Sequence, residues 1–200
     1  PAPRFTVVSD ASNSGIGLLY EHGARCVEQA VSNERAGIPS AAHITIREAI
    51  ALRLAVCKPQ HANAGVTCIT DNSALFWLLR RGRAPRSTLL HNEIRELLRW
   101  CFSHRVTLFP LWISTTNMAH FGADEASRAL CDEKKYVSKS RLRECVNHGR
   151  FDTATLTAGC KTPAQVGLFA LPAKLIGMMF GPIPDRPASG EGYGTPRSSL

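Results

Sequence analysis

The sequence lacks the marks of several common protein classes. Its seven cysteines include no C-x-x-C pair and are odd in number, which together argue against a zinc site and a complete disulfide framework. Cys57, Cys68 and Cys101 lie in apolar stretches, which favours buried free thiols. No internal repeat is visible. We therefore expect a protein of a reducing, intracellular compartment, in the cytoplasm, the nucleus or both.

Long hydrophobic runs are also missing. The longest apolar stretch, VGLFALPAKLIGMMFG, is too short to span a bilayer and is interrupted by Pro172 and Lys174. An amphipathic helix at a membrane surface remains an alternative for this stretch, although we expect no membrane partner. The first residues, PAPRFTVV, include neither Met nor a leader pattern, so we interpret the chain as a segment of a longer polypeptide without a secretory signal.

Acidic residues are in the minority. The chain has 24 Lys and Arg against 16 Asp and Glu, a net charge of +8. A basic balance favours a polyanionic partner, although it does not choose between DNA, RNA and anionic lipid, and a basic protein without such a partner is the alternative. The hydrophobic content of 44% is enough for a core.

The pattern of apolar residues predicts an α/β fold. Strands are expected at residues 5–9, 15–20, 24–27, 66–70 and 106–113. Helices are expected from residue 45 to before Pro59 and at residues 73–81, 87–103 and 122–130, the third with an inward stripe of Leu90, Ile94, Leu97, Leu98 and Cys101. Three antiparallel strands followed by two crossover strands form a mixed five-stranded sheet flanked by helices.

The composition changes beyond residue 130. We expect residues 1–130 to form the main domain and residues 131–181 a basic, partly helical C-terminal extension. Residues 182–200 are rich in Pro, Gly and Ser, which predicts a flexible tail.

Four acidic residues stand at the ends of these elements: Asp10, Glu48, Asp71 and Asp124. Crossover handedness places the first and fourth strands side by side, so Asp10 and Asp71 are expected to be neighbours. Carboxylates at one edge of a sheet are typical of a hard-cation site of the Mg²⁺ kind. Each also has a plain alternative, since Glu48 can complete a capping box with Thr45, Asp71 and Asp124 can cap helices, and Asp10 can belong to a turn.

The motifs around these acids resemble those of the ribonuclease H family. VSDASNSGIGLLY is similar to its first two strands, ITIREAIAL to its helix bearing the metal-binding Glu, and ITDNSALFWLLRRG to its T-D-N/S strand end. NMAHFGADEASRAL is similar to the N-x-x-A-D-x-x-S-R closing motif of retroelement ribonucleases H. The T-D-N-S form resembles hepadnavirus polymerases and the tyrosine-recombinase retrotransposons of the DIRS and VIPER type.

The resemblance covers residues 5–130 and implies an endonuclease that cleaves the RNA strand of RNA–DNA hybrids during reverse transcription. It implies that Asp10, Glu48, Asp71 and Asp124 are catalytic and hold two Mg²⁺ ions, or Mn²⁺ in their place. In-line hydrolysis of a phosphodiester agrees with this, because two cations roughly 4 Å apart stabilise both the attacking water and the leaving oxygen. A reverse transcriptase domain, covalently joined or separate, is the implied protein partner.

Further residues are candidates for contact with nucleic acid. The polar side chains that follow two of the acids, Ser12, Asn13, Asn72 and Ser73, are candidates for the sugar-phosphate or a ribose 2′-OH, with turn or capping roles as the alternative. The arginine cluster, Arg80, Arg81, Arg83 and Arg86, is a candidate for the phosphate backbone, with a solvated helix end as the alternative. His120 is a solvated loop residue or, as the resemblance implies, an aid to product release or proton transfer.

Two competing functions stay open. A ribonuclease H-like domain that no longer cleaves would serve as a nucleic-acid-binding or assembly module. In the retrotransposons a D-L-F-A motif follows the ribonuclease H part, and PAQVGLFALPAKL resembles it with Gly167 in place of the Asp. A transposase or integrase fits less well, since the active sites of those enzymes usually include a Glu from a helix late in the sequence.

Overall fold

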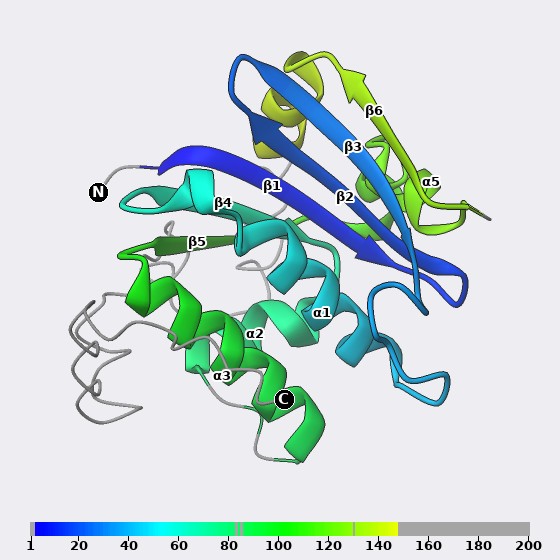
Figure 1. Ribbon diagram of the computed structural model, residues 1–200, viewed down its shortest axis with the longest axis vertical. Coiled ribbons are helices and arrows are strands. Elements are labelled where there is room, and N and C mark those ends of the chain that lie inside the picture. Colours follow the sequence, from blue (N-terminus) through cyan, green and yellow to red (C-terminus); the bar gives the residue numbers. More distant parts are fainter. Residues whose placement is uncertain (1–2, 83, 85, 130, 148–200) are drawn as a thin grey trace, which may run out of the picture.

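The computed structural model describes residues 3–82, 84, 86–129 and 131–147 and has an α/β architecture with one mixed sheet. The strands are β1 (Pro3–Ala11), β2 (Gly15–His22), β3 (Arg25–Ser32), β4 (Gly65–Thr70), β5 (Thr107–Trp112) and β6 (Glu133–Val137). Their order across the sheet is β5-β4-β1-β2-β3-β6 (Figure 1). The sheet thus runs from a parallel half to an antiparallel half, with β1 between them.

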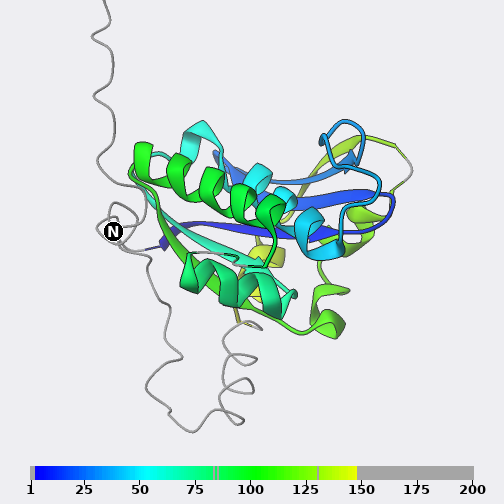
Figure 2. The same cartoon turned by 90° about the horizontal axis from the view of Figure 1, so that it is seen from below.

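Helices pack on the sheet and connect several of its strands along the chain. They are α1 (Ile44–Val56), α2 (Ser73–Arg81), α3 (Thr88–Ser103), α4 (Thr115–Met118) and α5 (Ala123–Ser127), with a 3₁₀ turn, η1 (Pro59–His61). Residues 140–147 are also helical. Helices α1 and α3 lie side by side over one face of the sheet, and α5 lies against β1, β2 and β3 (Figures 1 and 2).

The register of β1 with β4 confirms the predicted neighbourhood of the first and fourth strands. The two strands are parallel, and Val8 pairs with Ile69 near their carboxyl ends. Asp10 and Asp71 follow these paired residues by two positions each, so both lie at the same edge of the sheet. This edge carries the candidate site.

Two apolar clusters cover the two faces of the sheet. Because strand side chains alternate between faces, Val7 joins the cluster under α1 and α3, and Val8 joins the cluster on the opposite face. The predicted inward stripe of α3 is buried throughout, and α2 adds Leu75 and Leu79 to the same cluster. The opposite cluster is closed by Met118 of α4 and by residues around α5.

Within the described residues the sheet has six strands, and the prediction of five was wrong. β6 pairs antiparallel with β3 at the outer edge of the sheet. Its sequence, EKKYV, shows no apolar alternation, which agrees with the exposure of four of its five residues. Pairing with the free edge of β3 makes it a strand, and this partner is invisible in the local sequence.

The same sheet therefore continues past residue 130, where the main domain was predicted to end. Leu142 and Cys145, from helical residues 140–147, are buried in the cluster on the α5 face. The rest of the predicted extension, the predicted tail and Gly167 lie outside the described residues.

The structure also bears on the predictions for the last helix and for the cysteines. The predicted helix at 122–130 is the shorter α5, preceded by the unpredicted α4. Cys68 and Cys101 are buried free thiols as predicted, and Cys57 is half-buried and free. In the part of the chain that the structure describes, no helix is long and apolar enough to cross a membrane.

Candidate metal centre

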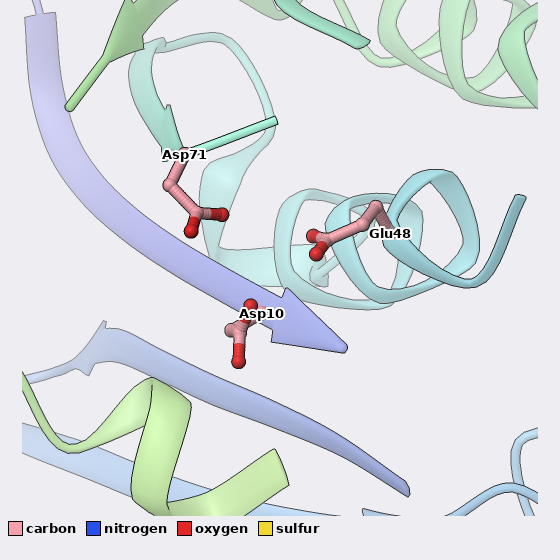
Figure 3. Close-up of side chains that lie close together, drawn as sticks. All are labelled: Asp10, Glu48 and Asp71. Atoms are coloured by element: carbon pink, nitrogen blue, oxygen red, sulfur yellow. The ribbon is translucent and has the colours of Figure 1, made fainter. Parts of the chain in front are cut away.

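Three carboxylates from three separate elements converge at the edge of the sheet. Asp10 lies near the end of β1, Glu48 in α1, and Asp71 directly after β4 (Figure 3). One oxygen from each carboxylate lies within 4.8 Å of the other two. Asp10 and Glu48 are only 5% and 3% exposed. Such a buried acidic cluster could hold a metal ion.

Neither Glu48 nor Asp71 has the helix-capping role that was its alternative. The N-cap of α1 is His43, whose ring nitrogen Nδ1 accepts from the Thr45 amide at 3.2 Å, so the expected Thr45–Glu48 capping box is wrong. Asn72, rather than Asp71, caps α2, and its side chain accepts from the Leu75 amide at 2.9 Å. Both carboxylates are therefore free to face Asp10.

The three acids form no ion pair with a cation of the described residues. Arg47, the buried cation beside Glu48 in sequence, donates instead to the backbone carbonyls of Ala42, Ser40 and Ser12. Oε2 of Glu48 is buried and has no hydrogen-bond partner among the residues that the structure describes. An orphaned carboxylate oxygen beside two other acids is the situation that a bound cation relieves.

The electrostatics of the cluster follow from burial and crowding. Burial raises the pKa of Asp10 to about 6, with the charges of Asp71 and Asp124 adding to it and a hydrogen bond from Ser127 opposing it. Burial also raises the pKa of Glu48 well above its usual range, helped by Asp10 and Asp71. The pKa of Asp71 is raised by burial, which a hydrogen bond with Thr115 partly offsets.

Gly17 allows α5 to approach the cluster. It lies directly opposite Asp10 in the β1–β2 pair, and a Cβ at this position would collide with the carbonyl oxygen of Ala123 and the amide of Ser127. The close contact lets the Ser127 hydroxyl donate to Oδ2 of Asp10 at 2.8 Å. Ser127 was not among the predicted site residues, although it is the Ser of the same ADEAS motif that contains Asp124.

Asp124 stands beside the cluster, outside the group of three. It lies in the first turn of α5, after the N-cap Gly122, so it is not an N-cap residue. Its charge contributes to the raised pKa of both Asp10 and Asp71. Its carboxylate is paired with Arg128 of the same helix turn at 2.6 Å. Three of the four predicted acids thus meet directly.

The position of Asp71 is supported by a tryptophan. The indole Nε1 of Trp112, at the end of β5, donates to the carbonyl oxygen of Asp71 at 2.9 Å. The parallel pairing of Thr70 with Trp112 places the indole there. The bond fixes the backbone from which the Asp71 carboxylate projects.

The two polar residues after Asp10 differ in accessibility. The Ser12 hydroxyl donates to the carbonyl of Ser127 and accepts from the amide of Gly15, so it closes the turn between β1 and β2. Asn13 is exposed, and its carbonyl accepts from the Asn33 side chain at 2.7 Å. The turn role, which was the alternative for Ser12, is the one observed.

The two polar residues after Asp71 also differ in accessibility. Asn72 is the N-cap of α2, and its amide Nδ2 donates to the Thr45 hydroxyl at 3.4 Å, so its side chain ties α2 to α1. Ser73, the first residue of α2, is exposed at the same edge as the cluster. Of the four polar candidates, Asn13 and Ser73 therefore present the most accessible side chains.

The arginine cluster is only partly a free surface. Arg80 lies 5.0 Å from the ring centre of Trp77 and 5.7 Å from that of Phe76. Arg81 and Arg86 are exposed and line a shallow pocket of about 410 Å³ after α2. Arg83 lies outside the described residues. His120 is exposed on the turn before α5, as expected for a solvated loop histidine.

Comparison with known proteins leaves the site to be interpreted from its own geometry. No family model, no curated protein and no solved structure matches this chain. The chemistry of the site is therefore inferred from its residues, their distances and their burial.

Proposed function

We propose that this protein is a metal-dependent endonuclease of the ribonuclease H type, which cleaves the RNA strand of RNA–DNA hybrids. The observation that carries the proposal is the convergence of Asp10, Glu48 and Asp71 within 4.8 Å at the carboxyl ends of β1 and β4. A mixed six-stranded sheet, with two parallel crossover strands, an antiparallel half and flanking helices, is broadly compatible with that fold.

The residues fit Mg²⁺ or Mn²⁺. Both are hard cations that prefer carboxylate oxygens, and Mg²⁺ keeps several waters, so few protein ligands suffice. The unpartnered Oε2 of Glu48 and the raised pKa of Asp10 are features of a site built for positive charge. A pair of such ions would stabilise both the attacking water and the leaving 3′ oxygen of a phosphodiester.

The protein's own residues would hold and orient this site. Asp10 lies in the field of the other three acids and would be the ligand shared by the two ions. The Ser127 hydroxyl sets the orientation of the Asp10 carboxylate. Glu48 and Asp71 would hold one ion. Asp124 would hold the other after its carboxylate turns from Arg128, an exposed partner that can move into solvent.

Substrate preference would come from the edge around the acids. The exposed side chains of Asn13 and Ser73 are candidates for hydrogen bonds to a ribose 2′-OH, the group that distinguishes RNA from DNA. Arg81 and Arg86 are candidates for the phosphate backbone. The natural context would be reverse transcription inside the cell, in the cytoplasm or nucleus, with a reverse transcriptase domain as partner.

A cleavage assay tests the proposal. The wild-type chain, Asp71→Asn and Glu96→Gln would be incubated with a labelled RNA–DNA hybrid in Mg²⁺ or EDTA, beside single-stranded RNA and duplex DNA. We expect Mg²⁺-dependent cleavage of the hybrid alone and a loss of at least about 1,000-fold in Asp71→Asn. Glu96 is a half-exposed acid on α3 and serves as the matched control. Cleavage by Asp71→Asn at the wild-type rate, with an unchanged circular dichroism spectrum, would sink the proposal.

The second candidate function is a nucleic-acid-binding or assembly module that does not cleave. It is favoured by the ion pair of Asp124 with Arg128, which withdraws the fourth acid from the cluster. Calorimetric titration with Mg²⁺ separates the two candidates. Two bound ions in the presence of hybrid support the endonuclease, and one ion or none, with hybrid bound but intact, supports the module.

A further inference from the structure

A second surface on the sheet gathers cations and aromatic rings away from the acids. We call it the β3–β6 patch, and it comprises Arg25, Lys58, Lys134 and Tyr136, with the buried ring of Tyr20 beneath Lys58. β3 and β6, which carry three of these residues, lie at the end of the sheet opposite β5 (Figure 1). Neither the proposed cleavage nor the metal centre uses any of these residues.

The register of β3 and β6 determines which of their charged side chains lie on each face of the sheet. Val27 belongs to the core under α1, and it pairs with Tyr136, so Tyr136 faces the same side. Lys134 lies two positions earlier and faces that side too. The intervening Lys135 points the other way, where it pairs with Glu28. The α1 face of this sheet edge is thus left basic and aromatic.

Two ring contacts organise the patch. The guanidinium of Arg25 lies 4.8 Å from the ring centre of Tyr136, and the ammonium of Lys58 lies 4.8 Å from that of Tyr20. Tyr136 is 56% exposed, the highest value among the exposed large hydrophobic side chains of the described residues. An exposed ring with a planar cation against it offers a stacking platform.

The cations of the patch lack an acidic partner. Among the described residues no carboxylate forms an ion pair with Arg25, Lys58 or Lys134. The pKa of Lys58 is lowered, first by burial and then by the charge of Lys134. Charges of one sign held together without compensation cost free energy, which an added polyanion returns.

We propose that the β3–β6 patch binds a single strand of nucleic acid, with a base stacked on Tyr136 and phosphates on Lys134, Lys58 and Arg25. An aromatic ring among cations matches a single strand better than a duplex, whose bases are already stacked and hidden. Lys58 of the patch follows α1, the helix that carries Glu48, by two residues.

Binding without cleavage tests this surface independently of the proposed activity. Fluorescence anisotropy in EDTA would follow labelled single-stranded oligothymidylate and a DNA duplex on the full chain. The variants are Tyr136→Ala, Tyr136→Phe, Lys134→Ala and, as a matched control, Arg99→Ala, which removes a half-exposed cation from α3. We expect Tyr136→Ala to weaken single-strand binding roughly tenfold and Tyr136→Phe to retain it.

The salt dependence completes the test. Lys134→Ala should weaken single-strand binding severalfold and reduce the slope of log K against log salt by roughly 0.7, whereas Arg99→Ala should do neither. The proposal is overturned if the patch variants bind the single strand as Arg99→Ala does. It is equally overturned if they weaken duplex binding as much as single-strand binding, since the stacking role would then be absent. Folding of each variant is checked by circular dichroism, and Tyr136 and Lys134 are exposed enough to be replaced without loss of the core.

Discussion

Buried carboxylates occur in two regions beside or within this sheet, and the two regions differ in whether cations of the protein pair with them. Glu28 on β3 is 2% exposed and is bound by Lys135 at 2.6 Å and by Arg141 at 2.8 Å. Asp10 and Glu48, buried to a similar degree, lie beside Asp71 with no cation in the described chain to pair with them. One region is compensated by cations of the protein itself, and the other has no compensating cation among the described residues.

The difference separates a structural acid from a group of acids that could hold a metal ion. The Glu28 carboxylate joins β3, β6 and the helical residues 140–147, and a Cβ on Gly122 would collide with it, so α5 is fitted around it. A buried charge that the fold has paired needs no further partner. Three crowded carboxylates with raised pKa values cost stability, and a fold keeps such a cost where it serves binding.

Loss of the compensated acid should have the largest effect on stability. Glu28→Ala is expected to lower the free energy of unfolding by about 3 kcal/mol, because two charge-assisted bonds that join three elements disappear. Urea unfolding measures it. Lys135→Ala is the matched comparison and should cost less, since that side chain is 45% exposed. Equal losses in the two variants would contradict the central role given to Glu28.

Added cation should reverse the cost at the uncompensated acids. Mg²⁺ or Mn²⁺ at about 100 times its Kd is expected to stabilise the wild type by about 2.7 kcal/mol, because only the folded state assembles the site. Thermal unfolding at increasing metal concentration measures the effect. Glu48→Gln should lose most of it, whereas Glu133→Gln, which removes an exposed acid from β6, should keep it. A metal response that survives in Glu48→Gln would place the cation elsewhere.

Neutralising Asp10 should stabilise the metal-free protein. The pKa of Asp10 is raised from 3.8 to about 6, so its ionised form is disfavoured in the fold. At neutral pH, Asp10→Asn is therefore expected to gain about 2 kcal/mol in the free energy of unfolding. The amide oxygen can still accept from Ser127. Chemical denaturation in EDTA tests this, and a destabilised Asp10→Asn would argue that the acid is compensated after all.

The same shift sets the direction of the pH dependence. A carboxyl whose pKa is raised by folding contributes full stability below its unfolded value and loses it as the pH rises through its folded value. Wild-type stability in EDTA should thus fall as the pH rises from 3.8 through the Asp10 pKa of about 6. The fall should be shallower in Asp10→Asn and in wild type saturated with Mg²⁺. Urea unfolding across this pH range measures it, and the same pH dependence in wild type and Asp10→Asn would contradict the raised pKa of Asp10.

The smallest effect is expected at the exposed ion pair beside the cluster. Arg128→Ala removes the partner of Asp124, but the arginine side chain is 67% exposed, and such pairs contribute little. Its melting temperature should stay within about 1 °C of wild type, and metal affinity should be equal or tighter because Asp124 is released. Calorimetric titration measures the affinity, and weaker metal binding in Arg128→Ala would assign the arginine a supporting role in the site.

Local pattern was enough for most elements and for the acids themselves. The β-branched runs, the period of α3 and the turn residues depend on neighbours within a few positions, so the core strands and long helices could be predicted. The adjacency of Asp10 and Asp71 could also be predicted, because crossover handedness leaves few arrangements of β1 and β4. A carboxylate at a strand end is visible in sequence, and its partner in space is visible once strand order is known.

Contacts between distant segments could not be predicted in this way. β6 is a strand only because the edge of β3 offers it hydrogen bonds, and the Thr45–Glu48 capping box failed because the N-cap lies two residues earlier, at His43. The hydrogen bond of Ser127 to Asp10 spans 117 positions. Such bonds carry no periodic signal, since nothing in either segment alone reports the other.

By itself, then, the sequence determined the α/β class, the basic balance and the set of acids, all of which depend on composition and short-range order. Only the tertiary structure decided which acids are compensated. Glu28 has the same chemistry as Glu48, and its compensating charges come from Lys135 and Arg141, more than 100 positions away. The energy of a buried charge depends on what the fold brings within a few ångströms of it.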